Sequence, residues 1–287
     1  MAILPTLALK EYHENYPDLP SPSVLSAALK SPAHLAYYLQ TPRKPTDEYN
    51  FGSLIHEFIE NNFVFPDKLY TEEAEVYKRA TGDAQAGDPK LDDDGDPKFT
   101  YVCTVDPERT LTASNSKKAK AVMKGLSECD EVKAYLAEGK VVVEQSMTGE
   151  INGVKVKCRP DILIEFKDKI VLLEIKTTRH GLVDLMGFSR DFFDMNYDMQ
   201  CCFEAEITQQ NYPDKPVEVL VLAVSSDMPA GAAIVDMPDT LVEIGKAKII
   251  DALAVWATKP TKTFYFTKGT LGISYMATEY RARKGIE

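Results

Sequence analysis

The middle of the chain carries two apolar patterns that predict a pair of β-strands. From residue 154 to 158, apolar side chains alternate with charged ones, which is the period of a strand with one buried face. Residues 170–176 begin with an apolar run and predict a second strand. Lys167-Asp168 lies between them and is a turn signal. We therefore predict a β-hairpin in this segment.

The length of the hairpin loop determines which residues face each other. If the turn is a two-residue loop, Asp161 stands directly opposite Glu174, and Arg159 stands opposite Lys176. Directly opposed residues share a face, with Cβ atoms roughly 4.5–5.5 Å apart. The face continues back along the first strand provided that Pro160 does not shift the register.

Apolar spacing predicts the elements around this hairpin. Helical spacing favours helices over 21–40 (two short ones, opening at Ser21 or Ser23 and at Ser31-Pro32), 51–60, 112–126, 130–138, 191–210 and 239–257. Further strands are expected over 141–148, 216–224 and 232–236. These elements predict an α/β fold with a central mixed sheet flanked by helices.

Composition narrows the class of protein. A length of 287 residues allows one large domain or two small ones, and a hydrophobic content of 44% suffices for a core. No basic N-terminal region and no apolar run of ~18 residues is present, so we expect a soluble cytoplasmic protein without membrane contact. Five scattered cysteines suit reduced thiols. A net charge of −11 predicts that any DNA-binding surface is a local groove or channel.

The two facing acids indicate a metal site. Carboxylates at such a range repel each other unless a cation lies between them. Mg²⁺ is the expected ion, because one or two carboxylates, waters and substrate phosphate oxygens typically hold it. Lysines on the same face would bind phosphate, which indicates phosphodiester chemistry. The alternative is an exposed hairpin with charges on its wet face, which accounts for the lysines but not for opposed acids.

A further candidate ligand lies in the predicted helix 51–60. His56 and Glu60 stand one turn apart on one face of this helix. A histidine in such a helix is ordinarily a surface residue or a satisfied core residue. The spacing alone therefore does not make His56 a ligand.

These segments resemble a known nuclease superfamily. Arg159-Pro160-Asp161, followed by Glu174-Ile175-Lys176-Thr177-Thr178, looks like motifs II and III of the PD-(D/E)XK nucleases. The sequence of these two motifs is similar to that of phage and prophage exonucleases of the exonuclease VIII (RecE) type. The pattern GxxxHxxxE, which ends at Glu60, is similar to the N-terminal helix motif of RecB- and RecE-type nucleases, whose histidine approaches the metal. The resemblance covers most of the chain, from about Ser21 to Glu206.

Helix 191–210 departs from the family pattern. Tyr197, Gln200 and Glu204 share a face, whereas the family has glutamine followed four residues later by tyrosine. Gln200 is a candidate only by resemblance, because glutamine on a helix is ordinarily solvent-facing. Relatives also carry a glutamate just before the hairpin, where this chain has Glu144; a surface acid on an edge strand is an equal alternative.

The resemblance implies a role for each candidate. Mg²⁺, replaceable by Mn²⁺, would be held by His56, Asp161, Glu174 and the backbone carbonyl of Ile175. Lys176 would orient or activate the attacking water, which makes the catalytic set Lys176, Asp161, Glu174 and Gln200. The expected DNA contacts are Lys155, Lys157, Arg159, Thr177 and Arg179, and the weaker site candidates are Glu60, Glu144 and Tyr197.

The resemblance also implies a domain plan and an activity. A single PD-(D/E)XK, or restriction-endonuclease-like, domain is expected over 1–287, with a helical region and polar insertion (1–138), the catalytic sheet and helix (139–236) and a C-terminal helix and tail (237–287). It would degrade one strand of linear double-stranded DNA from the 5′ end and leave 3′ overhangs for a single-strand annealing partner in recombination. Relatives form rings, so a homo-oligomer is expected, a tetramer rather than a trimer.

Two other functions stay open. One is a structure-selective or sequence-specific endonuclease on the same scaffold. The other is a catalytically inactive DNA-binding or structural protein, whose signature would be the loss of an acid or of the lysine; Asp161, Glu174 and Lys176 are all present.

The polar segment 66–110 is predicted to be a solvated loop. Its acidic cluster at 92–96 has the composition of a calcium loop, but Pro97 stands where an EF-hand needs glycine. The tail ends in a basic cluster at 281–284, which suits DNA or a neighbouring subunit, although a loosely ordered terminus is the default.

Overall fold

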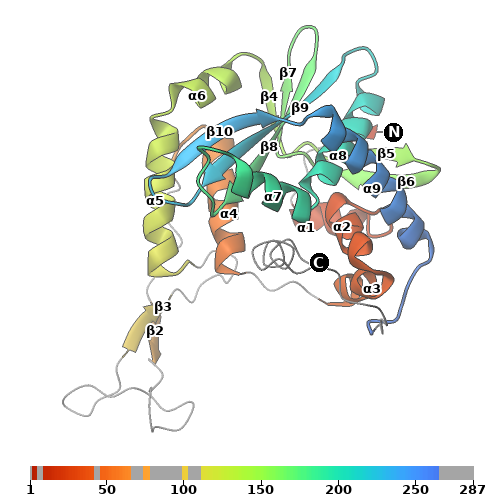
Figure 1. The fold of residues 1–287 in the computed structure, drawn as a ribbon, viewed down its shortest axis with the longest axis horizontal. Helices are drawn as coiled ribbons and strands as arrows, with labels where there is room; N and C mark the ends of the chain where they lie inside the picture. The colour runs from red at the N-terminus through yellow and green to blue at the C-terminus, as the bar shows by residue number, and fades with distance from the viewer. Residues whose placement is uncertain are drawn as a thin grey trace, which may run out of the picture.

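A computed structural model describes residues 2–4, 9–41, 46–65, 74–77, 99–102 and 111–264. A five-stranded sheet of spatial order β10-β9-β8-β7-β4 lies at its centre (Figure 1). β8 runs parallel to β9 and every other neighbouring pair is antiparallel, so the sheet is mixed, as predicted. Its strands are β4 (Lys140–Val143), β7 (Ile162–Glu165), β8 (Ile170–Thr178), β9 (Val217–Ser225) and β10 (Gly231–Asp236).

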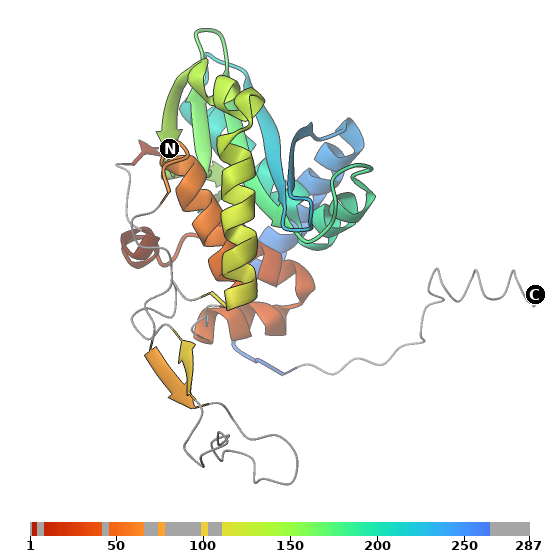
Figure 2. The ribbon, with the colours of Figure 1, turned by 90° about the vertical axis from the view of Figure 1, so that its left-hand side faces the viewer.

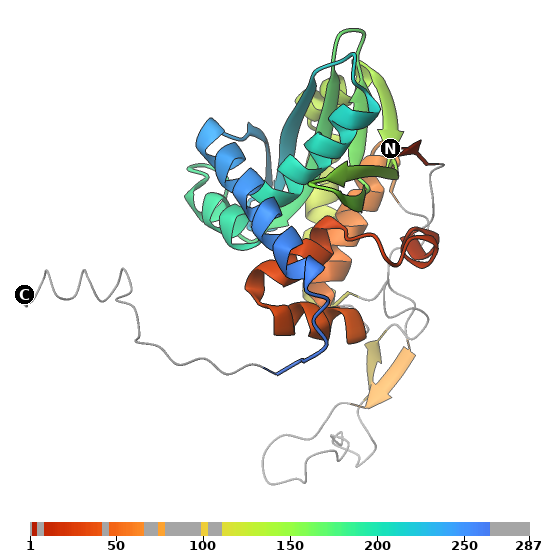
Figure 3. The ribbon, with the colours of Figure 1, turned by 90° about the vertical axis from the view of Figure 1, so that its right-hand side faces the viewer.

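Helices cover both faces of this sheet, and β8 is therefore buried on both. Successive residues of a strand point to opposite faces. Val171, Leu173 and Ile175 pack with α4 (Asp47–Glu60), α5 (Ala113–Ser127) and α6 (Asp130–Ala137). Figure 2 views the sheet from the side that these helices cover. Ile170 and Leu172 pack with a layer shown in Figure 3 that consists of α2 (Pro22–Lys30), α8 (Tyr197–Asn211) and α9 (Asp239–Ala257).

A second, smaller sheet corrects the prediction of one continuous strand before the hairpin turn. β6 (Val154–Cys158) pairs with β5 (Met147–Ile151), which pairs with β1 (Ala2–Ile3), whereas β7 belongs to the central sheet. The chain changes sheet across residues 159–161, where Pro160 cannot donate a ladder hydrogen bond. Residues 155 and 157 therefore do not continue the face of the hairpin.

Two other predicted elements are also divided. The strand predicted over 141–148 is β4 and β5, separated at Glu144, whose φ of 51° is left-handed and ends an extended run. The helix predicted over 191–210 is α7 (Met186–Asp194) and α8, separated at Asn196 with a φ of 58°. The short helices at 21–40 are confirmed as α2 and α3 (Pro32–Gln40), and α1 (Leu9–Asn15) precedes them.

The polar segment 66–110 contains a strand pair that was not predicted. β2 (Ala74–Tyr77) and β3 (Phe99–Val102) are antiparallel. The acidic cluster at 92–96, Cys103 and the basic cluster at 281–284 lie outside the described residues. The four cysteines within the described part of the chain are free thiols, as expected. No helix of the described ranges combines the length and the apolar character needed to cross a membrane.

Candidate metal centre and active site

The β7–β8 hairpin places the two acids as the register predicted. The N–H of Phe166 donates to the carbonyl of Lys169 at 2.9 Å, which closes the two-residue loop. The ladder then pairs Ile162 with Leu173, and one step further Asp161 faces Glu174. The predicted opposition of the two carboxylates is confirmed.

The two acids are also held by backbone hydrogen bonds. The Asp161 N–H donates to Glu174 Oε1 at 3.2 Å, and the Ile175 N–H donates to Asp161 Oδ2 at 2.8 Å. Asp161 thus uses its side chain where the ladder ends, which fixes its carboxylate beside the backbone of β8. A hydrogen bond from the backbone favours the ionised carboxylate.

The Lys176 ammonium lies between the carboxylates. Its Nζ is 2.8 Å from Glu174 Oε2 and 3.6 Å from Asp161 Oδ2. Burial disfavours the charged lysine, but the Glu174 and Asp161 carboxylates outweigh it and raise the pKa of Lys176 well above its usual value. The chain itself therefore supplies one cation that offsets the repulsion between the acids.

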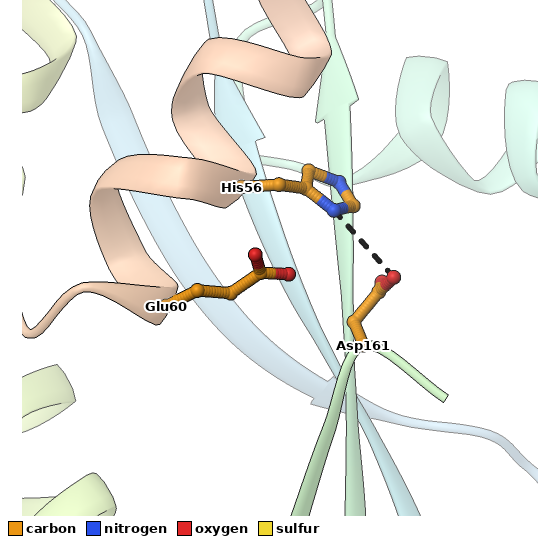
Figure 4. A group of neighbouring side chains, drawn as sticks. All are labelled: His56, Glu60 and Asp161. Carbon is orange, nitrogen blue, oxygen red and sulfur yellow. Dashed lines mark ion pairs between the residues drawn. The ribbon is translucent and has the colours of Figure 1, made fainter. Parts of the chain in front are cut away.

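Helix α4 brings a histidine and a third acid to the same place (Figure 4). His56 Nδ1 lies 3.5 Å from Asp161 Oδ1, and one ligand atom each of His56, Glu60 and Asp161 falls within 4.8 Å of the others. Burial, only partly opposed by His56, raises the pKa of Glu60 to about 7. Burial by itself would raise the pKa of Asp161. The neighbouring His56 and Lys176 outweigh this effect and hold the pKa of Asp161 below its usual range.

A glycine lies where α4 approaches β8 closely. A Cβ built at Gly52 would lie 3.3 Å from Thr177 Oγ1, so a larger residue would require the Thr177 side chain to shift by a few tenths of an ångström. Gly52 precedes His56 by one helical turn. The spacing GxxxH therefore has a packing reason as well as a chemical one.

Helix α8 approaches the acids from the other face of the sheet. Gln200 Nε2 donates to Glu174 Oε2 at 2.9 Å and to Glu204 Oε1 at 3.2 Å. Lys176 Nζ lies 5.1 Å from the centroid of the Tyr197 ring. Burial and the nearby Glu174 raise the pKa of Glu204 well above its usual value. Glu204 stands where the family has tyrosine, and both effects favour its protonated form over the carboxylate.

The basic residues expected to contact DNA are separated by the change of sheet. Lys157 is only 3% exposed, and its Nζ donates to the carbonyls of Tyr12 and Tyr16. The expectation that Lys157 contacts DNA is therefore wrong, because α1 covers it. Arg159 forms an ion pair of 2.7 Å with Glu144, so the two candidates before the hairpin are partners.

The other expected contacts differ in their distance from the acids. Thr177 lies on β8 next to Lys176, half-buried against α4, and the exposed Arg179 follows the end of this strand. Lys155 is exposed on β6, in the smaller sheet.

The predicted site residues that the structure brings close together are His56, Glu60, Asp161, Glu174, Lys176 and Gln200, with Tyr197 beside them. Glu60, expected only as a weaker candidate, joins this group because it lies one turn after His56 on the same face.

Comparisons with known proteins place this arrangement in a family. A family model described as "PDDEXK-like domain of unknown function (DUF3799)" matches residues 21–260, which is most of the chain. The chain belongs to this PDDEXK-like family. Its membership of the PD-(D/E)XK superfamily, inferred from the motifs around Asp161 and Glu174, is confirmed.

A solved structure shares the fold of this PDDEXK-like protein. A crystal structure named "Putative exonuclease" from Eubacterium rectale has a TM-score of 0.55 at 15% sequence identity and covers 94% of this chain and 97% of its own. At that identity the likeness concerns the fold alone. A protein named SSO0001 is also 15% identical, with a TM-score of 0.26 over 48% of this chain and 65% of its own. No curated protein matches the sequence significantly.

The donor atoms of the site suit a divalent cation. Carboxylate oxygens of Asp161 and Glu60 lie together with one imidazole nitrogen, that of His56, and the backbone N–H of Ile175 on the neighbouring β8 holds the Asp161 carboxylate. Mg²⁺ and Mn²⁺ accept oxygen ligands, and imidazole is tolerated best by the softer ion. The residues present therefore fit the divalent-metal chemistry of the superfamily.

Proposed function

We propose that this chain is a metal-dependent exodeoxyribonuclease that degrades one strand of linear double-stranded DNA in the 5′-to-3′ direction. The observation that carries the proposal is the meeting of His56, Glu60 and Asp161 within 4.8 Å, next to the Glu174–Lys176 ion pair. The RecE-type sequence motifs of the hairpin support the exonuclease branch of the superfamily. So does the name of the structural neighbour from Eubacterium rectale, although that likeness is one of fold.

The proposed cofactor is Mg²⁺, for which Mn²⁺ can substitute. Its ligands would be His56, Asp161, Glu174 and the Ile175 carbonyl, and Glu60 would hold it directly or through water. When bound, such an ion would stabilise the negative charge that develops on the phosphate and on the leaving oxygen.

The protein residues divide the remaining work. Lys176 carries its ammonium 2.8 Å from Glu174, where it can donate a hydrogen bond to the attacking water and to a phosphate oxygen. Gln200 holds Glu174 from the opposite face and keeps that carboxylate turned toward Asp161. The acids in turn are fixed by the backbone of the hairpin, so little reorganisation is needed when a phosphodiester arrives.

Linear and circular DNA distinguish the proposed activity from an endonuclease on the same fold. Duplex labelled at its 5′ ends should release short labelled products with Mg²⁺, duplex labelled at its 3′ ends should not do so at early times, and a covalently closed circle should stay intact. Asp161→Asn should be inactive on all three. Nicking of the closed circle would replace the proposal by an endonuclease, and inactivity of the wild-type protein on every substrate would replace it by a DNA-binding role.

We further propose a ring of subunits and a single-strand annealing partner that uses the 3′ overhangs. An acidic chain has to hold DNA through a local basic surface, and a ring concentrates the basic residues of several subunits around one channel. Of the residues predicted to contact DNA, Lys155 and Arg179 are exposed and suit such a surface. Light scattering at micromolar concentration should give the mass of a tetramer. A monomer mass, combined with one cleavage per encounter on long duplex, would contradict the ring.

A further inference from the structure

A groove of about 790 Å³ lies beside the candidate active site, between the α2–α3 pair and the start of α8. This volume is within the range of roughly 300–1,000 Å³ that is typical of ligand sites. Figure 1 shows α2 and α3 below α7 and α8 at this place. A hydrogen bond of 3.2 Å from Asn196 Nδ2 to Ser26 Oγ joins the two walls of the groove.

The lining of the groove is unlike the rest of the chain in charge. The chain has 44 acidic residues and a net charge of −11. None of the described residues that line the groove is Asp or Glu, whereas Lys30 and His34 both line it. Such a surface is the local exception that an acidic protein needs in order to hold a polyanion.

Aromatic rings accompany these basic groups. Tyr37 and Tyr38 line the wall formed by α3, and Tyr37 is 57% exposed. The ring of Tyr197 lines the opposite wall. Aromatic side chains next to basic ones are the pattern of sites for unpaired nucleic acid, because bases can stack on a ring only when they have left the duplex.

The groove also reaches the proposed catalytic residues. Gln200 lines it and donates to the Glu174 carboxylate, and Tyr197 lines it and lies 5.1 Å from Lys176 Nζ. We propose that the groove binds a single strand of DNA, the strand whose phosphodiester lies at the metal site. Its bases stack on Tyr37 and Tyr38, and Lys30 neutralises a phosphate. This inference rests on the proposed nuclease function for the identity of the strand.

Binding without cleavage tests the groove separately from catalysis. In chelator, a fluorescent oligothymidylate of about ten nucleotides, within the site sizes of single-strand binding proteins, is titrated with protein and followed by anisotropy. Tyr37→Ala and Lys30→Gln should each weaken binding roughly tenfold, as expected for the loss of a stacked base or a phosphate contact. Lys30→Gln should also lower the slope of log K against log salt concentration by about 0.7.

Matched controls use exposed residues of the same type that do not line the groove. Tyr49→Ala and Lys120→Gln should bind the oligonucleotide as tightly as the wild-type protein. Equal weakening by the control variants, or wild-type affinity in both groove variants, would overturn the proposal. Hydrolysis of bis(p-nitrophenyl) phosphate, a diester without bases, should be the same in wild-type and groove variants. If the wild-type protein leaves both this diester and linear duplex DNA intact, the nuclease function fails, while the binding data in chelator still decide on the groove.

Discussion

The backbone N–H of Asp161 donates a hydrogen bond of 3.2 Å to the Glu174 carboxylate, so the two facing acids are linked across the hairpin. Glu174 is fully buried, and its other oxygen accepts from Lys176 and Gln200. Every oxygen of this carboxylate is therefore already bound to a donor of the chain. Its replacement affects the fold as well as any bound metal.

Glu174→Gln should abolish cleavage and also destabilise the protein. The substitution removes the 2.8 Å ionic partner of the buried Lys176, and breaking a buried ion pair typically costs about 3–5 kcal/mol. Denaturant unfolding and the cleavage assay measure the two effects. Asp168→Asn, an exposed acid in the hairpin loop, is the control and should change neither. A more stable Glu174→Gln protein would mean that carboxylate repulsion dominates over the lysine contact.

His56→Ala should impair cleavage more with Mg²⁺ than with Mn²⁺. His56 Nδ1 is 3.5 Å from the Asp161 carboxylate, so its loss removes a ligand from the proposed site. Mn²⁺ binds nitrogen and oxygen sites more tightly than Mg²⁺ and should tolerate that loss better. The metal concentration that gives half-maximal cleavage should rise roughly tenfold or more with Mg²⁺. An equal rise with both ions would show that His56 acts only through packing.

Gln200→Ala should weaken metal binding without removing a metal ligand. Gln200 donates to both Glu174 and Glu204, and loss of a residue that orients a ligand typically costs 10–100-fold in metal affinity. Calorimetric titration with Mn²⁺ measures this directly. Gln209→Ala, at the other end of α8, is the matched control. Wild-type affinity in Gln200→Ala would assign the glutamine a purely structural role.

The hairpin could be predicted because its information is local. The two-residue turn at Lys167-Asp168 sets the register, and the register alone places Asp161 opposite Glu174. The helical spacing of His56 and Glu60 likewise placed both on one face. What spacing could not give is how closely α4 approaches β8, where a Cβ at Gly52 would lie only 3.3 Å from Thr177 Oγ1.

The strand predictions are wrong at the places where the chain leaves one sheet and enters the other. Apolar residues alternate with polar ones through Arg159-Pro160, and the valine run 141–143 is followed by polar residues from Glu144 onward; the chain passes between two sheets at both places. The side-chain period is the same in either sheet, so it carries no signal of such a change. Lys157 shows the result: the pattern predicts an exposed charge, and the smaller sheet places it under α1.

That burial of Lys157 has a consequence for stability at alkaline pH. Burial lowers the pKa of Lys157 to about 8 from an ordinary value of 10.5. Between these two values the unfolded chain keeps a proton that the folded protein has released, so folded stability rises with pH in this window. Below about pH 8 the folded protein has to bury the charged ammonium, and this contribution to stability is lost.

Lys157→Met should remove this pH dependence and should also remove the Nζ donor of the Tyr12 and Tyr16 carbonyls, of which the Tyr16 carbonyl keeps the Leu19 N–H. Loss of a donor to a buried carbonyl costs about 1–3 kcal/mol. The variant should therefore be less stable than the wild-type protein, and the difference should widen as the pH rises from 7 to 10. Urea unfolding across this range measures it, with Lys155→Met, an exposed lysine of the same strand, as the control. A difference that stays constant or narrows with pH would contradict the burial of a charged Lys157 near neutral pH.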